Sequence, residues 1–432
     1  MAIISSINRN RGSCREVKSL TRQVQAFCAN TKDRIRKLLR STRVKVIAIA
    51  IAIAIAVAFI TIAIAFITIA IAFITIVFSI ALYSLLNPLD KSSTIGAFYS
   101  SNPGVGPDAE LWGRGGSYFR WQSRQPENSQ WPALNIFYRT FGNIDNPRIV
   151  MIHGGPTSSY DFKELISVLE KEYYIGVIDT PGYGFSDKPK GSYRYSVPDD
   201  AQLIDYFVRE VLGLSRFTLF THDKGVSVGF AFLARYQQTD SPAYKIDHHV
   251  ILNGGLYLPL AELTAAQKYL TLPVFGPFMT RFILTPGRFT AALAKVYSPV
   301  LTQEEQLNMS STFKYQGGTT VFPKTLRYLE DRHEFEKTWL QTLNRSEIPA
   351  TLIWGEQDPI AKTEIGNFVW ENYLRNRRAA ASYWRLPCAS HYPQNDQPEV
   401  IAELVRWSLS EEGATFTGMQ NSKCAPVLVE AS

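Results

Sequence analysis

Three side chains of the 432-residue sequence have the types and the order of a catalytic triad. Asp223, Asp358 and His391 each come shortly after a predicted strand, where open α/β sheets place their ligands. A carboxylate can act as a nucleophile, and a histidine oriented by a second carboxylate can act as a general base. The order nucleophile, acid, histidine is that of one type of hydrolytic triad. The three positions therefore predict a hydrolytic site.

A serine close to Asp223 competes for the role of nucleophile. Residues 225–229 match the serine-elbow pattern G-x-S-x-G, with Ser227 at its centre. For Ser227 to lie at the turn, the preceding strand would have to bury the charged residues 222–224. With Asp223 at the turn, the strand ends cleanly at Phe220. The sequence favours Asp223, while Ser227 as nucleophile and Asp223 as a mere helix cap remain alternatives.

A glycine turn follows an earlier predicted strand. It consists of His153, Gly154, Gly155 and Pro156. Its glycines allow a tight turn and expose main-chain N–H groups to an oxyanion. The glycine-punctuated segment 179–186 follows the next strand and is interpreted as architectural.

The elements around these positions alternate between strands and helices. Strands are predicted at residues 118–121, 135–140, 148–152, 174–179, 216–220, 249–252, 350–354 and 382–386. Helices are predicted at residues 160–172, 198–211, 225–236, 365–374 and 398–409. The first two strands suit a hairpin, and the others predict an α/β fold with a mostly parallel sheet covered on both faces.

The stretch 257–345 breaks this alternation, is mainly helical in pattern and is interpreted as a cap over one end of the sheet. The expected organisation begins with a basic N-terminal segment (1–45), a transmembrane segment (46–86) and a linker (87–116). The first part of the core (117–256), a helical cap (257–345), the second part of the core (346–412) and a tail (413–432) follow.

The segment Val46–Leu86 contains 41 residues without a charge, Gly, Pro or Asn. As a helix it would be about 60 Å long, twice the thickness of a bilayer core of about 30 Å. Phe-Ile-Thr recurs at 59–61, 66–68 and 73–75, a period of seven that aligns the phenylalanines on one stripe. We expect a membrane-spanning helix, whose stripe is a surface for self-association or simply a lipid-filling repeat.

Charge is divided unevenly between the two ends of the chain. Residues 1–45 hold 12 Lys or Arg and two acidic residues, whereas the remainder holds 33 basic and 36 acidic residues, a net charge of −3. Nucleic-acid binding by the folded body is therefore not expected. The basic block favours a cytoplasmic N-terminus and one crossing, which puts the body outside the cytoplasm. Two crossings and an organelle transit peptide are the alternatives.

The sequence resembles the α/β-hydrolase superfamily, in its epoxide hydrolase and haloalkane dehalogenase branch, over about residues 117–410. The resemblance lies in the H-G-x-P turn at 153–156, the D-x-P-G-x-G-x-S loop at 179–186 and an aspartate followed by x-G at 223–225. Within that superfamily, the sequence is similar to the mesoderm-specific transcript proteins at 222–225, 253–255, 285–287 and 390–394.

The resemblance implies an α/β-hydrolase fold with an inserted helical cap and a two-step mechanism. Asp223 would attack an electrophilic carbon, and His391, oriented by Asp358, would activate the water that hydrolyses the resulting ester. The main-chain amides of Gly155 and Lys224 would hold the oxyanion. No metal or cofactor is implied.

Two positions bear on the substrate. The dehalogenases carry Trp directly after the nucleophile, and Lys224 stands there in this sequence, which argues against dehalogenation. Epoxide hydrolases use two cap tyrosines; Tyr328 occupies the place of one, and Tyr257 or Tyr269 is the candidate for the other. We expect a small apolar substrate, either an epoxide or a lipid-like ester. A serine esterase using Ser227 and a non-catalytic membrane protein that binds through the fold are the alternatives.

Overall fold

The computed structural model describes residues 14–40, 42–86, 94–102, 106–263, 265–270, 291, 294, 296–297, 301–410 and 422–431. The chain divides into two compact units, Met1–Asn87 and Pro88–Ser432. In their described parts, the first unit holds two long helices and the second holds a sheet with its covering helices.

The N-terminal unit consists of α1 (Cys14–Arg40) and α2 (Thr42–Leu86) in its described part. No Gly or Pro interrupts α2, and the hydroxyl groups of its threonines Thr61, Thr68 and Thr75 donate to carbonyl groups one turn earlier, at 2.8–2.9 Å. The window Val44–Ile76 is long and apolar enough to cross a membrane, and none of it is buried within the protein. The predicted apolar helix is confirmed.

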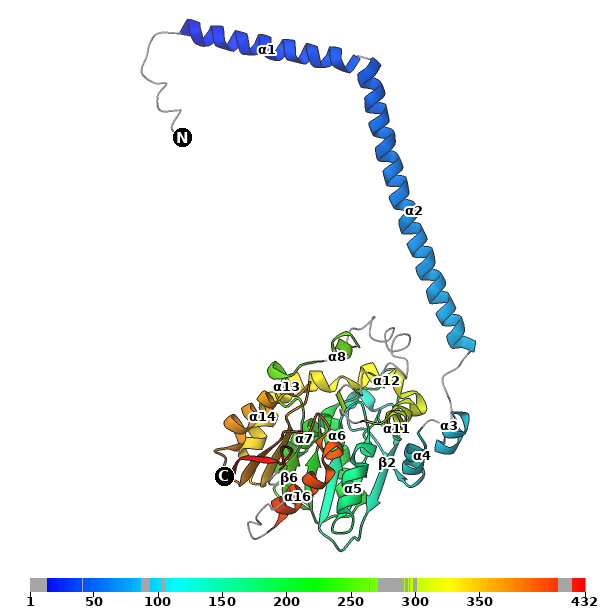
Figure 1. Cartoon of the computed structure of the whole chain (residues 1–432), viewed down its shortest axis with the longest axis vertical. Coiled ribbons are helices and arrows are strands. Elements are labelled where there is room, and N and C mark those ends of the chain that lie inside the picture. Colours follow the sequence, from blue (N-terminus) through cyan, green and yellow to red (C-terminus); the bar gives the residue numbers. More distant parts are fainter. Residues whose placement is uncertain are drawn as a thin grey trace. The chain divides into compact units, whose positions relative to one another are not determined.

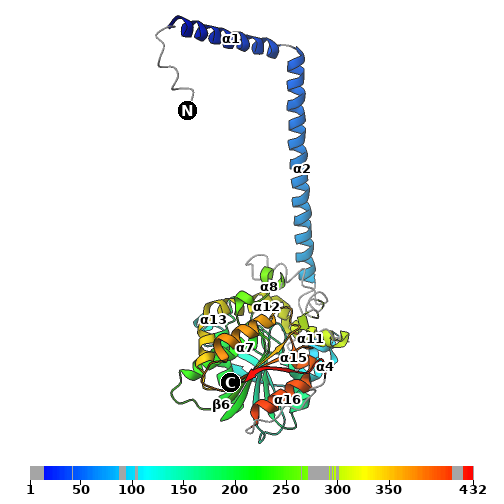
Figure 2. The same ribbon diagram turned by 60° about the vertical axis from the view of Figure 1, so that its left-hand side comes forward.

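The second unit is built on a nine-stranded sheet, counted among the described residues, in the order β1-β2-β4-β3-β5-β6-β7-β8-β9 (Figures 1 and 2). Neighbouring strands from β4 across to β8 are parallel, whereas the outer pairs β1–β2, β2–β4 and β8–β9 are antiparallel. The strands are β1 (Ser117–Trp121), β2 (Leu134–Phe141), β3 (Arg148–Ile152), β4 (Tyr174–Ile178), β5 (Arg216–Thr221), β6 (Lys245–Ile251), β7 (Ala350–Gly355), β8 (Ala381–Leu386) and β9 (Val427–Ala431). The predicted fold class and the predicted hairpin of the first two strands are confirmed.

Helices cover both faces of the sheet. α5 packs with α16, whereas α6 packs with α7 and α7 with α13. The helices outside the cap are α3 (Ile95–Ser101), α4 (Pro107–Arg114), α5 (Lys163–Leu169), α6 (Val197–Tyr206), α7 (Lys224–Gln237), α14 (Thr363–Val369), α15 (Pro393–Asp396) and α16 (Pro398–Leu409). Short 3-10 or π-helical turns extend this set at Pro126–Asn128, Ser159–Phe162, Phe207–Val211 and Trp370–Leu374. The parallel strands are buried on both sides because their apolar residues face helices above and below.

The described part of the predicted cap is helical, as expected. It contains the 3-10 turn Leu258–Leu260, α8 (Ala265–Leu270), α11 (Gln303–Lys314), the turn Tyr315–Gly317, α12 (Gly318–Thr325) and α13 (Tyr328–Arg345). In both views α8, α11, α12 and α13 lie at the same end of the sheet (Figures 1 and 2). The segment 285–287, which contributed to the family resemblance, lies outside the described residues.

The predicted linker 87–116 proves to be structured where it is described. α3 and α4 lie within it, and their side chains Phe98, Tyr99 and Trp112 are buried. α4 begins at a Gly-Pro pair: Gly106 precedes the helix with a φ of +70°, and Pro107 is its first residue. This segment therefore belongs to the core of the second unit.

The predicted tail also contributes to the sheet. β9 pairs antiparallel with β8, and a disulfide joins Cys388 to Cys424, whose Cα atoms lie 5.1 Å apart. The covalent link holds the final strand at the edge of the sheet. A short edge strand and two cysteines 36 residues apart give no local sequence signal for this pairing.

Candidate active site

Asp223 lies at the sharp turn between β5 and α7. Its backbone has φ 47° and ψ −113°, and Asp223 and Gln316 are the described non-glycine residues with a positive φ. The turn depends on glycines: a Cβ at Gly225 would lie 2.2 Å from the carbonyl oxygen of Ile152, and one at Gly154 would lie 2.8 Å from Asp223 Cβ. A strained strand-to-helix turn of this kind presents its side chain above the end of the sheet.

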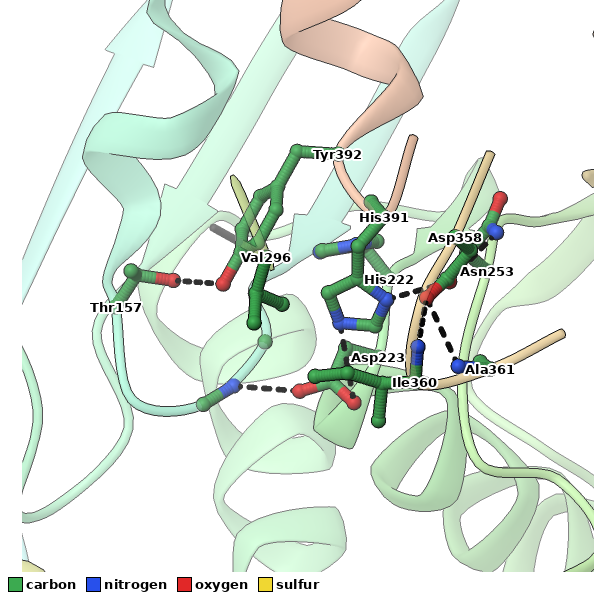
Figure 3. A network of polar contacts seen from close by, with 12 residues as sticks. Thr157, His222, Asp223, Asn253, Val296, Asp358, Ile360, Ala361, His391 and Tyr392 are labelled. Carbon is green, nitrogen blue, oxygen red and sulfur yellow. Dashed lines mark hydrogen bonds and ion pairs between the residues drawn. The ribbon is translucent and has the colours of Figure 1, made fainter. Parts of the chain in front are cut away.

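His391 lies between the two aspartates (Figure 3). Its Nδ1 is 2.6 Å from Asp358 Oδ2, and its Nε2 is 3.8 Å from Asp223 Oδ1. Asp358 Oδ1 accepts hydrogen bonds from the main-chain amides of Ile360 and Ala361, both at 2.8 Å. The structure thus brings the three predicted triad residues together, and all three are buried.

The electrostatic environment matches the charges that this arrangement needs. Burial lowers the pKa of His391, but the carboxylates of Asp358 and Asp223 together outweigh burial and leave that pKa above its ordinary value. Burial raises the pKa of Asp223, but His391 and Arg332 outweigh it and hold that pKa below its ordinary value. Asp223 is therefore poised as an anion next to a histidine that readily accepts a proton.

The predicted oxyanion donors flank Asp223. The amide of Gly155 donates to Asp223 Oδ2 at 2.9 Å, and Lys224, whose amide is the other predicted donor, opens α7 directly after the aspartate. Oδ1 thus faces His391 while Oδ2 is held by the glycine turn. His153 fixes that turn, because its Nδ1 donates to the Gly154 carbonyl at 2.5 Å while its Nε2 accepts from the Thr180 amide at 3.1 Å.

The side chain of Lys224 forms a buried ion pair that the sequence did not reveal. Its ammonium group is 2.6 Å from Asp200 Oδ2, donates to Thr180 Oγ1 at 3.1 Å and lies 4.6 Å from the centre of the Tyr183 ring. Burial raises the pKa of Asp200 to about 6 despite the opposing charge of Lys224. A small cavity beside this pair is also lined by Tyr328 from the cap.

Tyr328 is buried at the junction of core and cap. Its hydroxyl accepts a hydrogen bond from Gln267 Nε2 at 3.0 Å, and burial together with the Asp223 charge raises its pKa to about 12. The two candidates for a second tyrosine do not line the cavity beside Lys224: Tyr257 stacks on Phe368 at 4.0 Å, and Tyr269 is 52% exposed.

A further tyrosine of this cavity, Tyr183, comes from the core segment 179–186 and not from the cap. It lines the same cavity as Tyr328 and is buried. A Cβ at Gly155 would lie 3.3 Å from its hydroxyl, so the phenol lies beside the glycine turn. The sequence interpretation treated its segment, 179–186, as architectural only.

Ser227 lies one turn inside α7 and is engaged by a cap residue. Arg332, on α13, donates from Nε to Ser227 Oγ at 2.7 Å and from Nη2 to the Asp223 carbonyl oxygen at 2.9 Å. Arg332 is buried, although it lies in a stretch of α13 that is rich in charged residues. Only the tertiary fold reveals this contact.

Two further residues connect the triad positions to one another. The main-chain carbonyl oxygen of Asn253 accepts a hydrogen bond from the main-chain amide of Asp223 at 2.8 Å. The side-chain Nδ2 of Asn253 donates to Asp358 Oδ2 at 2.8 Å. His222 Nε2 contacts the His391 carbonyl oxygen at 2.8 Å. Both residues lie in motifs quoted for the family resemblance, which was the available signal. Among the described residues, no group of three or more His, Cys, Asp or Glu side chains is arranged so that it could hold a metal ion.

The fold is that of a known family. The family model of the α/β-hydrolase fold matches residues 147–398, and the chain belongs to that family. It is 31% identical to a putative hydrolase, LipZ, of Mycobacterium tuberculosis, over 62% of this chain and 90% of the relative. It is 30% identical to the mesoderm-specific transcript protein of Mus musculus, over 68% of this chain and 86% of that protein. The resemblance inferred from the motifs is confirmed.

A solved structure of an epoxide hydrolase from Bacillus megaterium shares the fold. It superimposes with a TM-score of 0.50 and 22% identity, covering 68% of this chain and 99% of that protein. At this identity the likeness concerns the fold, so any statement about chemistry has to rest on the side chains of this chain.

Proposed function

We propose that the protein is a membrane-anchored hydrolase that uses Asp223 as nucleophile and forms a covalent ester with an apolar substrate. The proposal rests on the different contacts that the two carboxylate oxygens of Asp223 make. Asp223 Oδ1 faces His391 Nε2 at 3.8 Å, whereas Oδ2 accepts the Gly155 amide at 2.9 Å. One oxygen is thus placed to attack, and the other is placed to carry negative charge.

The reaction proceeds in two steps. First, Asp223 Oδ1 attacks an electrophilic carbon, the bond from that carbon to its oxygen breaks, and the departing oxygen takes a proton from an acid in the site. Second, His391 removes a proton from water, and the hydroxide attacks Cγ of the Asp223 ester. Negative charge then develops on Oδ2, which the Gly155 and Lys224 amides stabilise. The bond from Cγ to the substrate oxygen breaks, that oxygen takes the proton from His391, and the alcohol leaves. The Asp223 carboxyl finally returns a proton to the acid of the first step.

Three side chains favour a substrate in which the departing atom is oxygen. Lys224, Tyr183 and Tyr328 line one small cavity, and Lys224 directly follows Asp223 in the chain. All three can donate a proton or a hydrogen bond to a developing alkoxide. An epoxide fits these donors because its oxygen stays attached to the substrate after ring opening.

The contacts of Ser227 favour Asp223 over the serine as nucleophile. Ser227 Oγ accepts a hydrogen bond from Arg332, and a hydroxyl that receives a cationic donor is a poorer nucleophile. Asp223, by contrast, has the backbone geometry of an elbow residue.

A comparison of two variants of the full-length protein in detergent tests the choice of nucleophile. Purified wild type, Asp223→Asn and Ser227→Ala are assayed against a panel of lipophilic epoxides and esters. We expect wild type to hydrolyse members of the panel, Asp223→Asn to be at least about 10³-fold slower, and Ser227→Ala to stay within a few-fold of wild type. An inactive Ser227→Ala beside an active Asp223→Asn would overturn the assignment.

We also propose that α2 crosses the membrane once, with the N-terminus in the cytoplasm and the hydrolase body on the other side. The basic residues before the span support this orientation. The Cys388–Cys424 disulfide supports it independently, because disulfides persist outside the reducing cytosol.

Sealed vesicles from cells expressing the full chain test this orientation. With the cytoplasmic face outward, added protease should leave the body intact and remove the segment before the span. Degradation of the body in sealed vesicles, together with reduced Cys388 and Cys424, would contradict it.

A further inference from the structure

The helix α1 has one continuous apolar face. Its exposed large apolar side chains are Leu20, Val24, Phe27, Ile35 and Leu38, each at least 52% exposed. At about 100° per residue these positions fall within an arc of roughly 80°, since they are spaced three, four, seven or eight residues apart. Nothing in the described N-terminal unit covers this face, whose side chains are all exposed.

The opposite face of α1 is basic. Arg22, Arg36 and Arg40 project about 140–180° from the middle of the apolar arc, and Lys32 about 100° from it. Residues 19–40 contain six Lys or Arg and one acidic residue, Asp33, which is paired with Lys37 at 3.4 Å. The helix therefore combines an apolar stripe with a strongly cationic side.

The position of α1 in the chain indicates what covers its apolar face. α1 ends at Arg40, α2 begins at Thr42, and the window able to span a membrane begins at Val44. A helix joined so closely to a membrane span is held at the surface of the bilayer. Its apolar side chains can then enter the boundary between headgroups and acyl chains, and its cations can meet anionic headgroups.

We propose that α1 is an interfacial helix that lies on the leaflet where α2 enters the membrane and binds anionic phospholipid. The inference rests on the proposed span of α2. With six Lys or Arg in residues 19–40, α1 is too polar to cross the bilayer itself.

Fluorescent probes on the full-length protein test this proposal. Cys14 and Cys28 are changed to Ser, and a single cysteine is introduced by Phe27→Cys on the apolar face or Gln25→Cys on the polar face. Ile60→Cys, inside α2, reports the span independently. Each variant carries an environment-sensitive fluorophore and is reconstituted in vesicles of phosphatidylcholine or of phosphatidylcholine mixed with phosphatidylserine.

With anionic vesicles, we expect the fluorescence emission of the probe at position 27 to shift to the blue and to be quenched by a nitroxide attached to the lipid. The probe at position 25 should keep the emission that it has in water. Changing both Arg22→Gln and Arg36→Gln should weaken the association of α1 with the surface roughly 30-fold, since each basic residue contributes about 1 kcal/mol. In vesicles of pure phosphatidylcholine, both the blue shift and the quenching of the probe at position 27 should be smaller.

Three results would overturn the proposal in distinguishable ways. Water-like probes at both 25 and 27 with a quenched probe at 60 would leave the span intact and remove the interfacial helix. An unquenched probe at 60 would remove the span and the interfacial helix together. A shielded probe at 27 that loses its shift when protein is diluted in lipid, whatever the lipid charge, would assign α1 to self-association instead.

Discussion

Arg332 on the cap helix α13 donates from Nη2 to the main-chain carbonyl oxygen of Asp223 at 2.9 Å. The same guanidinium lies 3.7 Å from Asp223 Oδ1, so its charge also helps to lower the pKa of that carboxyl. The cap is therefore attached to the turn that holds the proposed nucleophile. A single side chain thus both contacts this turn from the cap and helps to keep Asp223 charged.

Replacing Arg332→Met should affect both activity and stability. The pKa of Asp223 rises without the cation, so the carboxylate becomes protonated, and alkylation fails, at a higher pH than in wild type. The lost buried contacts should cost about 3–5 kcal/mol of the free energy of unfolding. The pH profile of alkylation and urea unfolding measure the two effects.

Ser227→Ala is the matched control for Arg332→Met, because it removes one acceptor of the guanidinium and keeps the charge. It should cost about 1–3 kcal/mol in stability and leave the pH profile of alkylation in place. A profile that moves equally in both variants would show that the charge of Arg332 does not tune Asp223.

Asp358→Asn should slow the hydrolytic step much more than the alkylation step. The carboxylate raises the pKa of His391 against the effect of burial, so its removal lowers that pKa. Because the general base must be neutral, activity requires a pH above the pKa of His391. Since the variant lowers this pKa, the rising limb of the hydrolysis profile should move to lower pH. The maximum rate should fall by about 10³- to 10⁴-fold because the imidazole loses its orientation. Rapid-quench measurement of ester decay against pH tests this; an unmoved rising limb would argue against the Asp358 role.

Tyr328→Phe should slow alkylation by an epoxide more than hydrolysis of an ester. The phenol lines the cavity beside Lys224, and an epoxide oxygen needs a donor during ring opening, whereas an ester leaving group departs more readily. Tyr257→Phe, whose ring stacks on Phe368, is the control and should change neither rate. Equal slowing of both reactions in Tyr328→Phe would remove its ring-opening role.

Two truncations test where the folded body begins. Deletion of residues 1–90 removes α2 and keeps α3 and α4, so it should yield soluble protein that unfolds cooperatively. Deletion of residues 1–116 removes the buried side chains of Phe98, Tyr99 and Trp112. It should lower the free energy of unfolding by several kcal/mol, because the loss of one buried aromatic side chain costs about 3–5 kcal/mol. Thermal unfolding of both proteins measures the difference. Equal stability would show that the segment 91–116 is the linker that its composition suggested.

The parallel strands could be predicted because they are apolar runs bounded by turns. β3 (Arg148–Ile152) was expected at these residues, and it leads directly into the glycine turn of the candidate site. The three triad candidates were identifiable for the same reason, since each follows such a strand and parallel strands bring their carboxyl ends together.

The parts that sequence missed depend on contacts between distant segments. Arg332 lies in a stretch of charges that resembles a solvent-facing helix, and only the packing of α13 on α7 buries it. β9 is a short edge strand whose place depends on pairing with β8 and on the disulfide. Lys224 was noted for its amide, whereas the pairing of its ammonium with Asp200 joins residues 24 positions apart.

The most direct test of the central claim is to trap the covalent intermediate. His391→Gln removes the general base but leaves Asp223 and its Gly155 contact intact. Full-length His391→Gln is incubated with the epoxides and esters that wild type hydrolyses, and its peptides are analysed by mass spectrometry. We predict a stable adduct, of the mass of the opened epoxide, on the peptide that contains Asp223, with fragment ions placing it on that residue. An adduct on Ser227, or no adduct from a substrate that wild type turns over, would contradict the account.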